Sequence, residues 1–165
     1  MFHYKNDKPM KITKVLVPCL LLFAALGSKA QTSNEIKDED LKKYAVTMDS
    51  VRAMQVTLQE LVAETVRSNT VMPIARYNEL FKFTDDEGKL KAANATPEEV
   101  AFLKQIADLR KVNIERINAT YQSLAKDYVG LKTFNAIRKS LQSDQALKAR
   151  YDNVAKNIDP KVKGG

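Results

Sequence analysis

Apolar side chains recur at steps of three and four residues over a long stretch from about Asp38 to Ser68. This spacing follows the turn of an α-helix, and it predicts one long amphipathic helix with a single apolar face. The acidic residues at 38–40 favour a helix start there, because the helix dipole stabilises negative charge at its amino end. The predicted apolar face consists of Leu41, Tyr44, Met48, Val51, Leu58 and Val62.

A second amphipathic stretch begins at Thr96 and continues to about Tyr128. Thr96 and Glu99 have the spacing of a capping box, and the proline after Thr96 suits the first helical turn. Arg110 interrupts the apolar face, and we expect it to lay its aliphatic stem on the core while its guanidinium reaches water. Because two such helices are not stable alone in water, we expect them to pack against each other or against a third element. The predicted apolar face consists of Val100, Leu103, Ala107, Ile114, Ile117, Tyr121, Leu124 and Tyr128.

A similar short segment follows each long helix. Residues 76–82 align with residues 133–139 when the chain is shifted by 57 positions. The long helices align less well, with residues 58–59 matching residues 121–122 at a shift of 63. Similarity at a nearly fixed offset is typical of a duplicated unit, so we predict two copies of a long-helix, short-helix repeat.

Turn-forming residues divide the short segments. Pro73 and Gly130 occupy equivalent positions just before the two segments. Proline suits a helix start and glycine permits a tight turn, so we expect a short helix after each. Ser143 and Asp144 predict a new cap for a last helix that ends before Pro160, whereas residues 85–88 predict a loop or a weak helical turn.

The repeat retains an asparagine in each short helix, Asn78 and Asn135, and each follows an aromatic residue, Tyr77 or Phe134. One hypothesis is a paired polar site between the two halves. We favour a structural role, in which each amide hydrogen-bonds a nearby backbone group. In that interpretation Tyr77 and Phe134 seat the short helices against the long pair.

Together these elements predict an all-α fold, an antiparallel helical bundle built from two repeats. We expect a helical domain at residues 31–160. Repeat one spans about 38–94 and repeat two about 96–158. A flexible basic tail follows at residues 161–165.

The short segments resemble a bacterial family known as domain of unknown function 4168. The shared pattern is Tyr/Phe-Asn-x-Leu/Ile, a polar break, and Leu-Lys-Ala at residues 90–92 and 147–149. The acidic opening at residues 38–44 is also similar to that family, and the resemblance covers roughly residues 36–158. Lys37 departs from the family pattern, in which a Ser or Thr cap is more usual. The resemblance implies an exported, mostly helical protein, and it implies no activity, cofactor or catalytic residue.

The first thirty residues have the three-part pattern of a secretory signal peptide. Lysines recur through residues 1–14, an apolar run of twelve follows at residues 15–26, and small residues precede a cleavage site between Ala30 and Gln31. The apolar run is shorter than the roughly 20 residues that span a bilayer. We therefore predict export to the periplasm or the extracellular space, with no transmembrane segment in the mature chain.

Two alternatives for this segment remain open, an uncleaved membrane anchor and a lipid-modified Cys19. A lipoprotein signal requires a small residue before its cysteine, at the end of the apolar run. Here Pro18 precedes the cysteine and further apolar residues follow it. We therefore expect Cys19 to be discarded with the signal peptide.

The mature chain lacks the residues of many catalytic centres. The one histidine, His3, and the one cysteine, Cys19, both lie in the predicted signal peptide. Without them the mature chain cannot form a Ser-His-Asp or Cys-His centre, a Cys/His zinc site or a Glu-x-x-His di-iron site. Residues 85–88 resemble the start of a calcium loop but lack its alternating ligands, so we expect a solvated acidic turn. We predict no enzyme activity, no metal and no cofactor.

The net charge of +7 comes mostly from the ends of the chain. The signal peptide carries five lysines and one aspartate, and residues 148–165 carry five basic and two acidic side chains. The remaining body is neutral. A basic chain of this kind gives no reason to expect nucleic-acid binding.

These observations predict an exported, non-catalytic helical envelope protein that binds another protein or an envelope polymer. An alternative is a periplasmic chaperone-like binder of unfolded clients, which long amphipathic helices would also suit. A carboxylate-dependent hydrolase is the remaining enzymatic alternative, although the sequence offers no clear pair of facing carboxylates.

Overall fold

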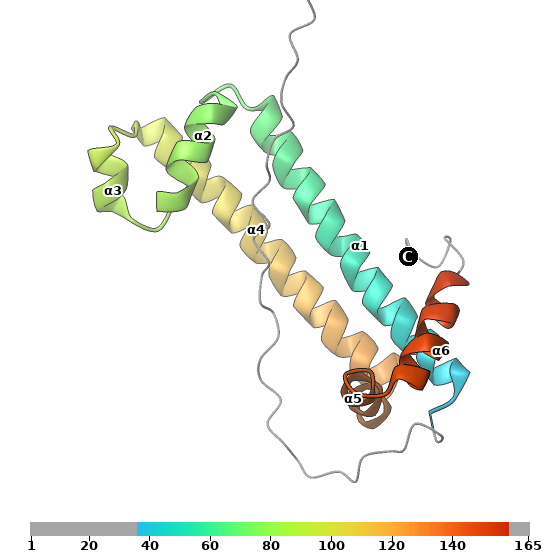
Figure 1. Cartoon of the computed structure of the whole chain (residues 1–165). Helices are drawn as coiled ribbons and strands as arrows, with labels where there is room; N and C mark the ends of the chain where they lie inside the picture. Colours follow the sequence, from blue (N-terminus) through green and yellow to red (C-terminus); the bar gives the residue numbers. More distant parts are fainter. Residues whose placement is uncertain (1–35, 159–165) are drawn as a thin grey trace, which may run out of the picture.

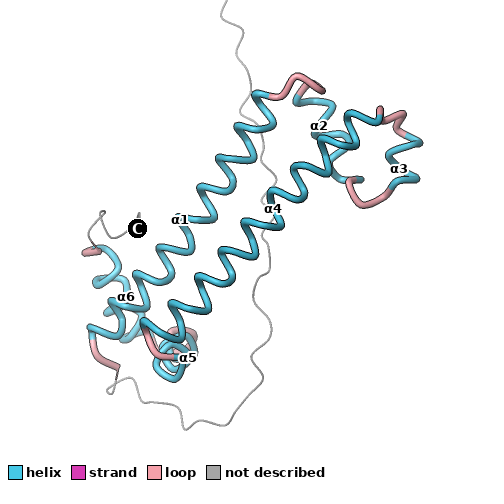
Figure 2. The backbone as a smooth tube through the Cα atoms, turned by 180° about the vertical axis from the view of Figure 1, so that it is seen from behind, coloured by secondary structure: helices cyan, strands magenta, loops and turns pink. Residues whose placement is uncertain are grey.

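The computed structural model describes residues 36–158 of the 165-residue chain. The predicted signal peptide, its cleavage site between Ala30 and Gln31, and the predicted tail at 161–165 lie outside the described residues. Residues 36–158 form helices and turns without a β-strand (Figure 2), so the predicted all-α class is confirmed.

Two long helices lie side by side and run in opposite directions (Figure 1). The first is α1 (Asp38–Ser68) and the second is α4 (Pro97–Ser123), which continues through a π-helical turn, η3 (Leu124–Tyr128). The sequence predicted both helices and their starting residues. The π-helical turn was not predicted, and it leaves Tyr128 44% exposed although its place in the predicted stripe favoured burial.

Short helices lie at both ends of this pair (Figure 1). Where α1 ends and α4 begins, the chain forms α2 (Ile74–Leu80), a 3-10 turn η2 (Phe81–Phe83) and α3 (Glu87–Ala92). At the opposite end it forms α5 (Leu131–Ser140) and α6 (Gln145–Lys156).

Local side-chain interactions determine where several helices begin. The capping box of α4 is confirmed: the Glu99 N–H donates to the Thr96 hydroxyl at 3.2 Å, and the Thr96 N–H donates to the Glu99 carboxylate at 3.0 Å. At the start of α1, the N–H of Lys37 donates to the Asp40 carboxylate at 3.2 Å. The carboxylate half of the capping arrangement is therefore present without a Ser or Thr cap.

The residues predicted to precede the short helices do so. Pro73 is the N-cap of α2 and Gly130 is the N-cap of α5. Gly130 has φ of 89°, a left-handed conformation that favours glycine. Asp144 caps α6, and Asp86 caps α3 by accepting a hydrogen bond from the N–H of Lys89 at 3.0 Å. The acidic residues near 85–88 thus start a short helix, which explains the weak helical turn expected there.

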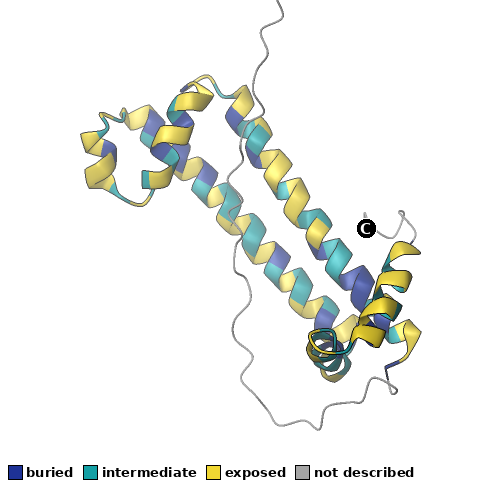
Figure 3. Cartoon of the chain, in the orientation of Figure 1, coloured by how far each residue is buried: buried dark blue, intermediate teal, exposed yellow. Residues whose placement is uncertain are grey.

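The apolar core is concentrated at the two ends of the long pair (Figure 3). The first cluster, the α2 core, consists of Val62, Val66, Met72, Tyr77, Leu80, Leu90, Phe102, Leu103 and Ile106. The second cluster, the α5 core, consists of Ile36, Leu41, Tyr44, Ala125, Val129, Phe134, Ile137 and Leu147.

The stretch between the cores, residues 47–61 of α1 and 107–123 of α4, is called the middle section. Its buried residues are Thr47, Val51 and Ile117, of which only Thr47 is completely buried. The hydroxyl of Thr47 donates to the Lys43 carbonyl at 3.0 Å, so this buried polar group is satisfied. Most remaining side chains there are half-buried or exposed, because each long helix has one long neighbour in this stretch.

The predicted apolar face of α4 omits Phe102 and Ile106, which are both buried. The ring of Phe102 packs edge-on against Tyr77 of α2, with the ring centroids 6.3 Å apart. At this end α4 contacts both α1 and the short helices, so it buries a wider arc than one amphipathic stripe predicts.

Because Leu80 is completely buried in the α2 core, Leu80→Ala should lower the free energy of unfolding by about 2–5 kcal/mol. Leu61→Ala is the matched control, since Leu61 is 43% exposed in the middle section, and it should cost less than about 1 kcal/mol. Urea unfolding followed by far-UV circular dichroism measures both. Equal losses from the two variants would contradict the placement of the core.

Candidate functional site

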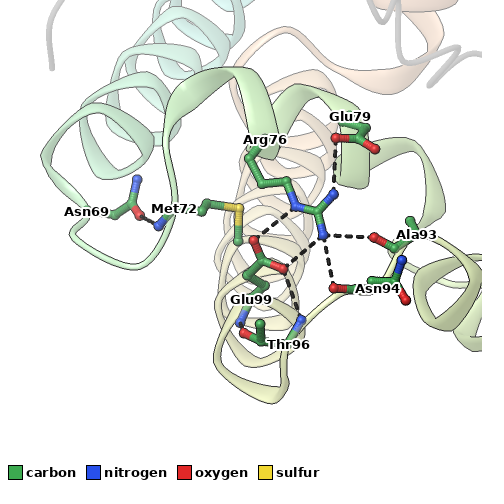
Figure 4. Close-up of polar contacts among 8 residues, drawn as sticks. All are labelled: Asn69, Met72, Arg76, Glu79, Ala93, Asn94, Thr96 and Glu99. Atoms are coloured by element: carbon green, nitrogen blue, oxygen red, sulfur yellow. Dashed lines mark hydrogen bonds and ion pairs between the residues drawn. The ribbon is translucent and has the colours of Figure 1, made fainter.

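A partly buried ion pair connects α2 to the start of α4 (Figure 4). The Nε of Arg76 donates to Glu99 Oε1 at 3.0 Å, and its Nη2 donates to Glu99 Oε2 at 3.2 Å. Nη2 also donates to the carbonyls of Ala93 and Asn94 at 2.9 and 3.2 Å, while Nη1 donates to Glu79 at 3.1 Å. The Arg76 guanidinium is therefore occupied by the protein itself, and its role is structural.

The pair also changes the titration of Glu99. The hydrogen bonds from Arg76, together with that from the Thr96 backbone, hold the pKa of this carboxyl below its ordinary value of 4.5. Glu99 is buried, so its carboxylate depends on these partners for compensation. One side chain thus caps α4 and joins it to α2.

A weaker contact of the same kind lies at the opposite end. The Nε and Nη2 of Arg150 in α6 donate to Asp38 Oδ1 at 3.1 and 2.6 Å. The Arg150 Nη2 also donates to the carbonyl of Ile36 at 2.8 Å. The Asp38 side chain is 70% exposed, so solvent screens this pair more strongly than the Arg76–Glu99 pair.

Beside the α2 core, an open groove of about 500 Å³ runs between η2 and α4. One wall comes from the η2 turn and the two residues that follow it, and the other comes from one face of α4. The lining residues are Phe81, Thr84, Asp85, Ala107, Arg110, Lys111, Ile114 and Glu115.

Arg110 is the most unusual group in this groove. Its guanidinium carbon lies 4.6 Å from the ring centroid of Phe81, within the range of a cation–π contact. Its Nε is buried without a hydrogen-bond partner, and Arg110 forms no ion pair with any residue from 36 to 158. The Nε of the guanidinium is thus buried beside the Phe81 ring, whereas we expected the whole group to reach water.

A second buried polar group lies behind Arg110. Tyr77 is only 6% exposed, its ring stacks on Phe81 with centroids 5.4 Å apart, and its hydroxyl lacks a hydrogen-bond partner. Burial raises the pKa of Tyr77, and the nearby charge of Arg110 opposes that rise. The phenol of Tyr77 and the guanidinium of Arg110 are therefore close enough to interact electrostatically.

The four residues singled out by the repeat do not form one site. Tyr77 and Asn78 lie on α2, while Phe134 and Asn135 lie on α5 at the opposite end of the long helices (Figure 1). Both aromatic rings are buried, in the α2 core and the α5 core respectively. Asn78 is exposed and Asn135 is half-buried, and neither amide makes the expected hydrogen bond with any residue in the described part of the chain.

The sequence identified only some of the residues that form the ion pair and the groove. Arg110 was recognisable as the residue that breaks the apolar face of α4. Arg76 and Phe81 were not singled out, because their partners on α4 lie more than twenty residues away in the sequence.

The described residues offer no group of three His, Cys, Asp or Glu side chains that could hold a metal ion. Of the helices between residues 36 and 158, none combines the length and apolarity needed to cross a membrane. No protein-family model, curated protein or solved structure matches the chain.

Replacing Glu99 by Gln should lower the melting temperature at pH 7 by roughly 3–6 °C, because charge-assisted hydrogen bonds to Arg76 are lost. The folded-state pKa of Glu99 is depressed, so this stabilisation is complete above pH 4.5 and disappears as the pH falls through the folded-state value. Thermal melts of Glu99→Gln and the unmodified chain should therefore differ at pH 7 and converge as the pH falls below the depressed folded-state pKa of Glu99. Asp38→Asn, at the exposed pair, should shift the melting temperature by less than about 2 °C.

Replacing Asn78 by Ala should change the free energy of unfolding by less than about 0.5 kcal/mol, because its side chain is exposed. The neighbouring Tyr77→Ala should cost about 3–5 kcal/mol, since it empties part of the α2 core. Urea titrations of the two variants give this comparison. A loss of more than 1 kcal/mol from Asn78→Ala would restore the structural role expected from the repeat.

Proposed function

We propose that this chain is an exported, non-catalytic helical module that binds another protein or an envelope polymer through the groove beside Arg110. The observation that carries the proposal is the Arg110 guanidinium, which lines an open groove, forms no ion pair with any residue from 36 to 158, and has a buried Nε without a hydrogen-bond partner. Its positive charge is not neutralised by an acid of the described chain, so an anionic group of a partner can pair with it at the groove. Export rests on the signal-peptide pattern of the first thirty residues and on the resemblance to domain of unknown function 4168.

We further propose that the fold is an antiparallel helical bundle formed by two copies of one unit. The N-caps of the long helices, Lys37 and Thr96, support this, because each is followed at the third helical position by the acid that accepts its N–H. These features correspond at a shift of 59 residues, whereas the sequence similarity of residues 58–59 to residues 121–122 lies at a shift of 63.

The short helices support the same proposal at a shift of 57. Pro73 and Gly130 cap them at corresponding positions. Three pairs of buried residues also correspond in the two copies: Met72 with Val129, Tyr77 with Phe134, and Leu80 with Ile137.

The exposed apolar residues of the long helices favour binding of a specific partner over chaperone-like capture of unfolded clients. The most exposed apolar residues of the long helices are Val56, Leu61 and Val112, at 45%, 43% and 64%. On α1, Val56 and Leu61 are five residues apart and so point in different directions. Single exposed apolar side chains are ordinary on a folded protein, whereas a holdase needs a continuous apolar surface.

In-cell photo-crosslinking tests the proposed function. A photoreactive residue at Glu115, which lines the groove, should give one dominant crosslinked product. The same residue at Gln105, exposed on α4 outside the groove, should give little. A smear of many products from both positions would favour chaperone-like binding, and equal single products would place the binding surface elsewhere.

A mass measurement of the mature amino terminus tests export independently. Cleavage between Ala30 and Gln31 should leave a chain that begins with Gln31. An intact amino terminus, or a lipid-modified Cys19, would contradict the proposed processing.

A further inference from the structure

The groove brings a cation, an aromatic ring and apolar side chains together on one face of α4. Ala107 and Ile114 are three and four residues from Arg110, so the three side chains share a helical face. Phe81 closes the opposite side and contacts the guanidinium at 4.6 Å. A ligand seated here would meet positive charge and apolar surface within a few ångströms of each other.

The cation is incompletely satisfied within the protein. A guanidinium has five N–H donors, and leaving such donors buried and unpaired costs free energy. Asp85 and Glu115 line the same groove, yet neither forms an ion pair with Arg110. The unpartnered Tyr77 hydroxyl behind the guanidinium is a second buried polar group without compensation.

We propose that the groove binds the free C-terminal carboxylate of a partner polypeptide whose last side chain is apolar. The inference rests on the proposed binding function and specifies the ligand. The carboxylate accepts paired hydrogen bonds from the Nη groups of Arg110, a geometry that guanidinium and carboxylate share. The last side chain lies against Ala107, Ile114 and Phe81.

The proximity of charge and apolar surface selects a chain terminus over a side-chain carboxylate. In a C-terminal residue, the carboxylate and the side chain are attached to the same Cα, so both can occupy this short span. An aspartate or glutamate side chain carries only one or two methylene groups beside its carboxylate, too little apolar surface to cover Ala107, Ile114 and Phe81.

The acidic residues of the groove favour a peptide over a simple fatty acid. Asp85 and Glu115 are hydrogen-bond acceptors near the cationic centre, and backbone N–H groups of a peptide can donate to them. A fatty acid has no N–H groups to donate, and its hydrocarbon chain would leave the carboxylates of Asp85 and Glu115 facing apolar surface.

The first long helix indicates which substitution of Arg110 can remove the cation without unfolding the protein. Val51 and Arg110 are each the fourteenth residue after the N-cap of their long helix, Lys37 or Thr96. Val51 is buried in the middle section. Valine is therefore compatible with this position in a long helix, and Arg110→Val removes the cation at little expected cost to folding.

The test is a titration of the purified, exported protein, followed by NMR, with acetyl-Ala-Ala-Ala-Leu as the free acid. We expect chemical shifts to change at residues 81–85 and 107–115. The C-terminal amide of the same peptide should bind at least about tenfold more weakly, since it cannot accept the paired charge-assisted hydrogen bonds. Arg110→Val should weaken the free acid similarly, whereas Arg116→Val, an exposed arginine of α4 outside the groove, should leave binding unchanged.

Arg110→Lys provides a second variant if Arg110→Val melts at a lower temperature than the unmodified protein. It keeps the charge but loses the planar paired donors, and it should also weaken the free acid. Equal affinity for acid and amide, or unchanged affinity in both variants, would overturn the proposal.

Two further ligands separate the possible sources of the carboxylate. If octanoate binds as tightly as the free-acid peptide, the ligand is a lipid acid. If acetyl-Ala-Ala-Ala-Asp amide binds as tightly, the ligand is an acidic side chain. Either result overturns the assignment of the groove to a C-terminal carboxylate. Binding by none of the ligands also overturns it. The crosslink from Glu115 tests the proposed binding function separately, because it requires no knowledge of the ligand.

Discussion

Along its middle, each long helix packs against one other long helix, and this limits where the chain can bury apolar surface. Two helices in contact share a single narrow interface, which accounts for the few buried residues of the middle section, Thr47, Val51 and Ile117. The short helices supply additional layers only at the ends. Stability therefore depends on closing both ends, and most fully buried side chains belong to the α2 core or the α5 core.

Both ends of the long pair are held by an ion pair between an arginine and an acid, but the two ion pairs differ in how deeply they are buried. In each, an arginine from a short helix bonds an acid in the first turn of the long helix that starts there. At the α2 end, Glu99 is buried and also closes the capping box, so a single carboxylate caps α4 and joins it to α2, while Arg76 also bonds the Ala93 carbonyl before α4. At the α5 end, Asp38 remains exposed, and apolar packing of Tyr44 against Phe134 and Tyr151 contributes relatively more.

Sequence patterns predicted the features that depend on neighbouring residues. The capping box at Thr96 and the turns at Pro73 and Gly130 involve contacts within a few positions, and these predictions are confirmed. Burial of Phe102 depends instead on α2, which the periodicity of α4 does not reveal. The environment of Arg110 likewise depends on Phe81, twenty-nine residues earlier in the chain, so the break in the stripe was visible while the groove was not.

Val51 and Arg110 follow the N-caps of their long helices by the same number of residues, but only valine suits burial at this position. The arginine is therefore not explained by folding, and we attribute it to the proposed binding function. Valine at this position buries an apolar side chain, whereas arginine there brings a guanidinium against Phe81 and leaves its Nε unpaired. Such a replacement lowers stability unless another interaction compensates for the desolvated donors. The cation–π contact supplies only part of that compensation, because it engages the face of the guanidinium and not its N–H groups. A residue that departs from the local packing pattern without full compensation is typical of functional positions. This is the physical argument behind the proposal that the groove beside Arg110 is the binding surface.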